Sequence, residues 1–203
     1  MIYSLSEIDA NCKKAARGVG LAWGYAEEVG KAARWLAAHQ LPGAELLAEY
    51  LTIRQKKTEN SQGAHPHCPL LTGARLCDAA IDLKNPIVLE HIVYPLLLLP
   101  YLAQLSQAAG RGLRIQWTGT HISCHDGVVF IKENASIASR EADMVGCCWL
   151  EPETHSPISL GKEQKNGVTG QLIDSNDWAA LEALAHFTYV PATEASRRGA
   201  GPS

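Results

Sequence analysis

The first twenty residues carry apolar side chains at helical spacing. The positions that recur three, four and seven residues apart are Ile8, Cys12, Ala15, Ala16 and Val19. This period predicts an amphipathic helix, and Ser4 and Glu7 have the spacing of a capping box at its first turn. The helix is expected to end near Gly18, because Gly18 and Gly20 are poor helix formers.

Two further helices are predicted before residue 60. One spans about residues 22–40 and the next runs from Ala44 to about Arg54. One face of the helix at 22–40 holds only small residues, which are Ala26, Gly30, Ala33 and Ala37. Small residues allow another backbone to come close, so this face is expected to meet a second helix or, alternatively, a second chain. Glu27 and Lys31 have i,i+4 spacing and are expected to form an ion pair on the outer side.

The middle of the chain has a weaker pattern. Residues 65–71 contain two prolines and are expected to be irregular, and a short helix is expected over residues 74–81. The most apolar stretch, residues 92–103, is 12 residues long, whereas a membrane span needs about 20. We therefore expect a buried core segment that is helical in its later part and ends at Gly110.

The second half of the chain changes to strand periodicity. Apolar and polar residues alternate over residues 113–118, which predicts a strand. Residues 120–124 and 128–133 flank the dipeptide Asp126-Gly127, and this arrangement predicts a β-hairpin. A further strand is expected over residues 143–150.

The order of these elements indicates the fold class. Residues 151–170 are expected to form a loop, and a final helix is expected to begin at Asp174 or Ser175. Helices first, strands next and one helix last are typical of an α+β fold. We therefore expect a single α+β domain over residues 1–191, with a helical N-terminal half packed on a small, mainly antiparallel sheet and a C-terminal helix. Residues 192–203 are expected to be a disordered tail.

The composition excludes several classes of protein. The 203 residues are 46% hydrophobic and 19% charged, with a net charge of −3. A disordered chain would contain fewer apolar residues, and a protein that binds nucleic acid by general electrostatics would be basic. Neither a nucleic acid nor a membrane is therefore expected as a partner. Glu7 and Asp9 lie where a secretory signal would be positive or apolar, so a cytoplasmic protein with free or metal-binding cysteines is expected.

Two groups of histidines and cysteines have side chains that could bind a metal or act in catalysis. His65, His67, Cys68 and Cys77 offer four zinc ligands, but their spacing matches no standard zinc finger. Within the segment 121–126, Cys124 could be activated by a neighbouring histidine. Successive side chains of a strand point to opposite faces, which argues against such a pair here. We therefore assign no metal ligand and no catalytic residue.

Charged and aromatic side chains gather where the first two helices meet. We call this set the N-terminal corner: Arg17, Trp23, Glu27, Glu28 and Arg34. An arginine and carboxylates beside an aromatic ring can orient a small charged ligand, and the alternative is a set of surface ion pairs that contribute little. The glycines at 18–24 resemble a dinucleotide-binding motif. That motif requires a strand before it, whereas a helix is predicted here, so a nucleotide site is not expected.

Several segments of the chain carry a family resemblance. The N-terminal segments are Glu7-Ile8, Lys14–Gly24, Ala26–Gly30 and Arg34–Leu36, and the later ones are Cys68–Leu70, Gly73–Asp78 and Pro95–Leu102. They resemble a bacterial, mainly proteobacterial, family of uncharacterised proteins of about this length. No activity is established for that family, so the resemblance implies no catalytic residue. It favours the N-terminal corner, Cys68 and Asp78 over the histidine clusters, which lie outside the resembling segments.

These patterns define an expected site and three classes of function. The residues expected to bind a ligand are Arg17, Trp23, Glu27, Cys68 and Asp78. The function that we expect is a cytoplasmic small-molecule binding or accessory protein of bacterial metabolism, whose ligand and cofactor the sequence does not identify. The alternatives are a hydrolase that uses a cysteine or a metal, and a structural or interaction subunit that assembles as a homo-oligomer.

Overall fold

The computed structural model describes residues 1–58, 68–79, 85–132, 135–150, 162–164 and 167–188. The helices are α1 (Leu5–Gly18), α2 (Trp23–Ala38), α3 (Gly43–Thr58), α4 (Pro69–Asp78), the 3-10 helix η1 (Pro95–Leu98), α5 (Leu99–Ala109) and α7 (Ser175–His186). The strands are β1 (Ile2–Ser4), β2 (Ile87–Val93), β3 (Leu113–Trp117), β4 (Thr120–His125), β5 (Val128–Ile131), β6 (Glu141–Trp149), β7 (Lys162–Gln164) and β8 (Gly170–Leu172). The fold is α+β with a C-terminal helix, as predicted.

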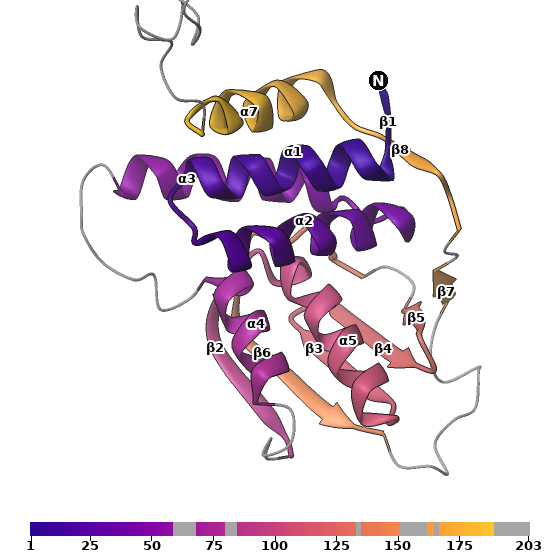
Figure 1. Cartoon of the computed structure of the whole chain (residues 1–203). Coiled ribbons are helices and arrows are strands. Elements are labelled where there is room, and N and C mark those ends of the chain that lie inside the picture. The colour runs from indigo at the N-terminus through magenta and orange to yellow at the C-terminus, as the bar shows by residue number, and fades with distance from the viewer. Residues whose placement is uncertain (59–67, 80–84, 133–134, 151–161, 165–166, 189–203) are drawn as a thin grey trace, which may run out of the picture.

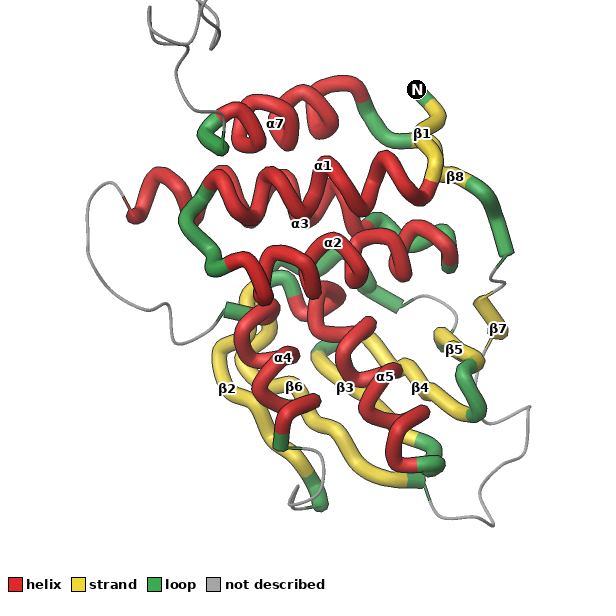
Figure 2. The backbone as a smooth tube through the Cα atoms, in the orientation of Figure 1, coloured by secondary structure: helices red, strands yellow, loops and turns green. Residues whose placement is uncertain are grey.

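The helices and strands form two stacked parts (Figure 1). In the first part, α1, α2, α3 and α7 lie side by side, and the short ladder of β1 with β8 borders them. In the second part, α4 and α5 lie on one face of a six-stranded antiparallel sheet with the order β2-β6-β3-β4-β5-β7. The tube in Figure 2 shows that α2 crosses above the upper ends of α4 and α5. This crossing places one face of α2 against α5.

Local sequence signals account for the first helix and the hairpin. The Ser4 hydroxyl accepts the Glu7 backbone N–H at 3.2 Å, and the Glu7 carboxylate accepts the Ser4 backbone N–H at 2.8 Å. This is the predicted capping box. In the turn between β4 and β5, Asp126 has a φ of 49° and Gly127 a φ of 76°. Two positive φ values are what a tight two-residue hairpin turn requires, so the predicted hairpin is confirmed.

The small-residue face of α2 is buried inside this chain. Ala26, Gly30, Ala33 and Ala37 are all buried, and a Cβ atom added at Gly30 would lie 2.6 Å from Asp9 Oδ1 and 3.0 Å from Lys13 Cβ. The missing side chain therefore lets α2 lie close to α1. Because this face is covered by α1, it gives no support to contact with a second chain.

Two local predictions were wrong, and one strand was not predicted. The helix α4 begins at Pro69 rather than near residue 74, because proline suits the first turn of a helix. The strand that was not predicted is β2, which ends at the start of the apolar stretch and is rich in β-branched residues that favour strands. The later part of the stretch is helical, and α5 ends at Gly110 as predicted. Residues 162–164, expected in a loop, form β7 and pair with β5. The predicted tail at 192–203 lies outside the described residues, and so do residues 151–161 and 165–166 of the predicted loop at 151–170.

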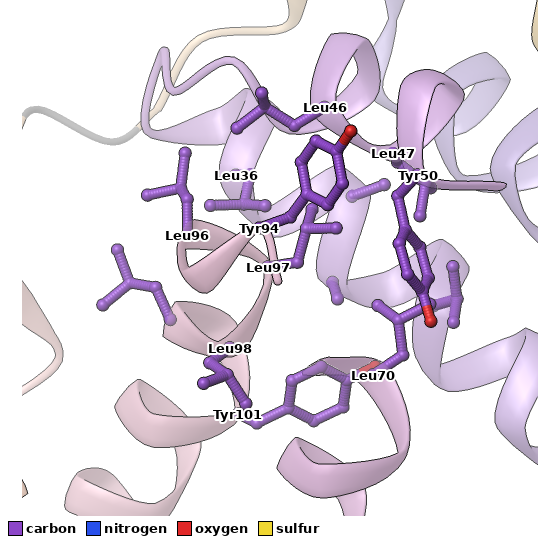
Figure 3. Packing of buried hydrophobic residues seen from close by; sticks show 14 of the residues in the cluster. Leu36, Leu46, Leu47, Tyr50, Leu70, Tyr94, Leu96, Leu97, Leu98 and Tyr101 are labelled. Carbon is purple, nitrogen blue, oxygen red and sulfur yellow. The ribbon is translucent and has the colours of Figure 1, made fainter. Parts of the chain in front are cut away.

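The hydrophobic core joins the two parts of the fold. Figure 3 shows leucines of α2 and α3 facing the leucines of η1, with Tyr50, Tyr94 and Tyr101 among them. The residues buried at this junction include Leu36, Leu47, Leu96, Leu98 and Leu102, each no more than 1% exposed. None of the helices within the described part of the chain is long and apolar enough to cross a membrane. All six cysteines are described, and each is a free thiol.

Candidate functional site

A cavity of about 300 Å³ lies between α2 and α5. We call it the α2–α5 cavity. From α2 it is lined by Glu28, Lys31, Ala32 and Trp35. These residues follow i, i+3, i+4 and i+7 spacing, so they share one face of the helix. The volume lies at the lower end of the range of small-molecule sites in proteins.

Glu28 and Lys31 form an ion pair at the opening of the cavity. Lys31 Nζ donates to Glu28 Oε1 at 2.7 Å, and the side chains are 65% and 37% exposed respectively. The hydrogen bond to the Glu28 carboxylate raises the pKa of Lys31. An exposed pair of this kind contributes little to stability, so both groups can turn to a ligand at small cost.

The α5 side of the cavity combines amide groups with an apolar surface. Gln104 and Gln107 are exposed and one helical turn apart, and each amide offers both donors and an acceptor. Pro100 and Tyr101 are buried and Ala103 is partly buried beneath them. The cavity therefore has a polar opening and an apolar interior, which is the usual arrangement of a ligand pocket.

Trp35 is held in place by a buried histidine at the end of α2. The rings of Trp35 and His39 are 3.9 Å apart, and His39 Nδ1 lies 2.8 Å from the Trp35 carbonyl oxygen. A carbonyl only accepts, so Nδ1 carries the proton and donates. His39 is 3% exposed, and its Nε2 is buried with no hydrogen-bond partner among the described residues. Burial lowers the pKa of His39 because it disfavours the charged ring.

His39 is expected to make the fold sensitive to mild acid. The pKa of His39 is lower in the folded protein than its value of 6.5 in the unfolded chain. At pH values above 6.5 the ring is neutral in both states, and its full contribution to stability is present. That contribution to stability is lost as the pH falls from the unfolded pKa to the lower folded pKa, because the unfolded chain then binds a proton that the folded protein does not. Replacing His39 with phenylalanine is therefore expected to flatten the pH dependence of stability below neutral pH. Urea denaturation at a series of pH values measures this, and an unchanged acid dependence in the variant would argue against a buried neutral His39.

Of the N-terminal corner, Arg17 and Trp23 lie beside the α1–α2 connection, whereas Glu28 and Arg34 lie further along α2. Arg17 Nη1 donates to the Leu21 carbonyl oxygen at 2.9 Å, and the guanidinium lies 5.4 Å from the centre of the Trp23 ring. Trp23 is 59% exposed and Glu27 is also exposed. The expected Glu27–Lys31 pair is wrong, because Lys31 pairs with Glu28 instead. The structure thus brings Arg17 and Trp23 together and uses Arg17 to hold the connecting loop.

Cys68 and Asp78 lie at opposite ends of α4. Cys68 precedes the first residue of the helix and is 1% exposed, whereas Asp78 is its last residue and is exposed. Ten residues of helix separate them by about 15 Å, so the two residues cannot contact one ligand group together. Cys68 Sγ accepts the hydroxyl of Tyr50 at 2.8 Å.

Two buried tyrosines flank Cys68, and sequence reasoning did not connect them with it. Figure 3 shows the hydroxyls of Tyr50 and Tyr101 turned toward the same region of the core, beside Leu70. The Tyr101 ring lies against Gly73, where an added Cβ would overlap it. The Tyr101 hydroxyl is buried without a hydrogen-bond partner among the described residues. Burial raises the pKa of both tyrosines, so both stay protonated at neutral pH.

Substitution by phenylalanine is expected to change the stability of the protein differently at the two tyrosines. Tyr50→Phe removes the donor to Cys68 and is expected to lower the unfolding free energy by about 1 kcal/mol. Tyr101→Phe removes a hydroxyl that is desolvated and unbonded, so it is expected to leave stability unchanged or raise it by up to about 1 kcal/mol. Chemical denaturation of the two variants in parallel checks this contrast. Equal losses would show that the Tyr101 hydroxyl has a partner after all.

The other histidine and cysteine groups form no common site within the described residues. His65 and His67 lie outside them, and no cluster of three or more His, Cys, Asp or Glu side chains suited to a metal ion occurs in the described part. His121 is exposed and Cys124 is buried, so they occupy opposite faces of β4, as predicted. Burial raises the pKa of Cys124 and that of Cys147 to about 12. Both thiols are therefore protonated at neutral pH and are poor nucleophiles.

Sequence reasoning found one side of the α2–α5 cavity in part. Glu28 belonged to the predicted N-terminal corner, but Lys31 and Trp35 were not connected with it as one face. The spacing from residue 28 to residue 35 is a signal that could have found this face. No pattern in the sequence indicates that Gln104 and Gln107 lie opposite it, because that depends on how α5 packs against α2.

Comparison with known proteins finds a family model that is similar to the N-terminal part of the chain. No curated protein and no solved structure matches it. The matching family model covers α1, α2, α3 and nearly all of α4. The match thus includes Cys68 and the α2 side of the cavity, but neither Asp78 nor the α5 side. Residues 3–77 are similar to the family described as Protein of unknown function (DUF3726).

Proposed function

We propose that the protein binds a small molecule in the α2–α5 cavity and serves as a cytoplasmic binding or accessory protein of bacterial metabolism. The observation that carries this proposal is the composition of the cavity. An ion pair, two amides and two aromatic residues line a cavity of about 300 Å³. Convergent polar groups around an apolar pocket are the usual features of a ligand site.

Two other hollows on the protein are less suited to binding a small charged molecule than the α2–α5 cavity is. A hollow of about 390 Å³ lies between α1 and α7, but Glu7 there serves the α1 cap and Glu182 accepts the Trp178 indole N–H at 2.9 Å. A hollow of about 460 Å³ lies on the other face of the sheet, and its lining is mainly apolar. The α2–α5 cavity differs from both in having a cation and an anion side by side at its opening, Lys31 and Glu28.

Binding is better supported than hydrolysis by a cysteine. Burial raises the pKa of Cys12, and it raises that of Cys77 to about 11. A thiol must lose its proton to act as a nucleophile, and no cysteine lines the α2–α5 cavity among the described residues. The groups that do line it are suited to holding a ligand rather than to forming a covalent bond with it.

Filling the cavity tests this proposal. The wild-type protein is screened against a library of small polar and charged compounds by calorimetry. Ala103→Trp places a large side chain in the cavity and is expected to abolish binding of the hits. Ala108→Trp lies on the exposed part of the same helix and is expected to bind them like the wild type. Hits that bind both variants equally would contradict the proposal, provided that circular dichroism shows both variants to be folded.

A further inference from the structure

We infer that the ligand of the α2–α5 cavity is a zwitterion of the amino-acid class with an apolar or aromatic side chain. This inference rests on the proposed function. It follows from the charges at the opening of the cavity, the neutral groups opposite them and the apolar interior beneath.

The opening presents one positive and one negative group side by side. Lys31 Nζ and Glu28 Oε1 are 2.7 Å apart. A ligand that carries an ammonium and a carboxylate on one carbon can give the first to Glu28 and the second to Lys31. Charge-assisted hydrogen bonds then form on both sides. A ligand with a single charge can pair with only one of the two groups, so it forms one charge-assisted hydrogen bond fewer than a zwitterion does.

The opposite side of the cavity adds no net charge. Gln104 and Gln107 are neutral, and each amide can donate to a carboxylate or accept from an ammonium. The charge of the described lining residues is therefore balanced, with one cation and one anion. A ligand that is neutral overall but charged at both head groups complements this arrangement.

The interior accounts for the rest of the ligand. Ala32, Trp35, Pro100, Tyr101 and Ala103 offer an apolar surface with two aromatic residues. Aromatic rings attract one another through offset or edge-to-face contact. A volume of about 300 Å³ suits a single amino acid better than a peptide.

Calorimetric titration with L-phenylalanine and two truncated analogues tests the inference. 2-Phenylethylamine lacks the carboxylate, and 3-phenylpropionate lacks the ammonium. We expect L-phenylalanine to bind and each analogue to bind at least about tenfold more weakly, because each loses a charge-assisted hydrogen bond.

Substitutions identify which protein group meets which charge. Lys31→Met is expected to weaken L-phenylalanine binding about tenfold and to leave 2-phenylethylamine unaffected. Glu28→Gln is expected to weaken L-phenylalanine similarly and to leave 3-phenylpropionate unaffected. Matched controls are Lys14→Met on α1 and Glu90→Gln on β2, both at exposed positions, and neither is expected to change binding.

The outcomes separate this inference from the proposed function. Equal binding of all three compounds would overturn the zwitterion while leaving a small-molecule site in place. The same holds if none of the three binds but other library compounds do and Ala103→Trp abolishes their binding. If no compound binds in the cavity, the proposed function itself fails.

Discussion

The Leu36→Ala variant is expected to lose about 2–5 kcal/mol of unfolding free energy, the usual cost of removing a fully buried leucine side chain. Leu36 is 0% exposed. Its side chain lies next to Gly43, where an added Cβ would overlap it, and Figure 3 shows it between the leucines of α3 and those of η1. Its removal would leave a cavity where the helical part meets the sheet part.

Chemical denaturation measures the effect, and Ile53→Ala provides the control. Ile53 lies on α3 and is 40% exposed, so its truncation is expected to change stability by less than about 1 kcal/mol. A loss at Leu36 no greater than the loss at Ile53 would contradict the central position of Leu36 in the core.

The Gly18→Ala variant is expected to be destabilised by about 1–3 kcal/mol, although alanine is the better helix former. A Cβ at this position would overlap the backbone carbonyl of Leu184 in α7. A side chain can rotate away from such an overlap, but a backbone carbonyl cannot. The two helices would therefore have to move apart.

Gly24→Ala is the matched control for this prediction. Gly24 is also helical, and nothing lies within 4 Å of a Cβ added there. The control is expected to gain up to about 1 kcal/mol from helix propensity alone. Thermal denaturation of both variants and the wild type measures the two effects. A Gly18→Ala variant more stable than the wild type would show that α1 and α7 do not pack as closely as described.

The parts of the fold that could be predicted depend on contacts close in sequence. The α1 cap involves residues three apart, and Asp174 caps α7 by accepting the Asn176 backbone N–H at 2.8 Å. The hairpin turn needs only the conformations of Asp126 and Gly127. Each of these features is recorded in a few neighbouring residues, so a single sequence is enough to find it.

The missed strands depend on partners far along the chain. β2 pairs with β6, with Ile87 opposite Cys147, and β7 pairs with β5, with Phe130 opposite Glu163. An apolar run of β2's length is compatible with a buried helix or a buried strand. Only the partner strand decides between them, and its position is set by the whole fold.

In the candidate site, too, features that depend on neighbouring residues could be predicted, whereas features that depend on packing between distant segments could not. The pattern of charges near residue 28 drew attention to a part of α2 that lines one side of the cavity. The second side of the cavity depends on the packing of α5, where Tyr101 fills the space left by Gly73 in α4. Cys68 was singled out for its surroundings in the sequence, and its contact is with Tyr50, eighteen residues away.

The claim that small molecules bind between α2 and α5 is tested most directly by NMR. Amide proton–nitrogen correlation spectra are recorded as ligand is added, beginning with L-phenylalanine and the library hits. The account predicts shifts at residues 28–35 and 101–107, with little change at Arg17, Trp23 or the outer sheet residue His121. Shifts at Arg17 and Trp23 or at His121, with α2 and α5 unchanged, would contradict it.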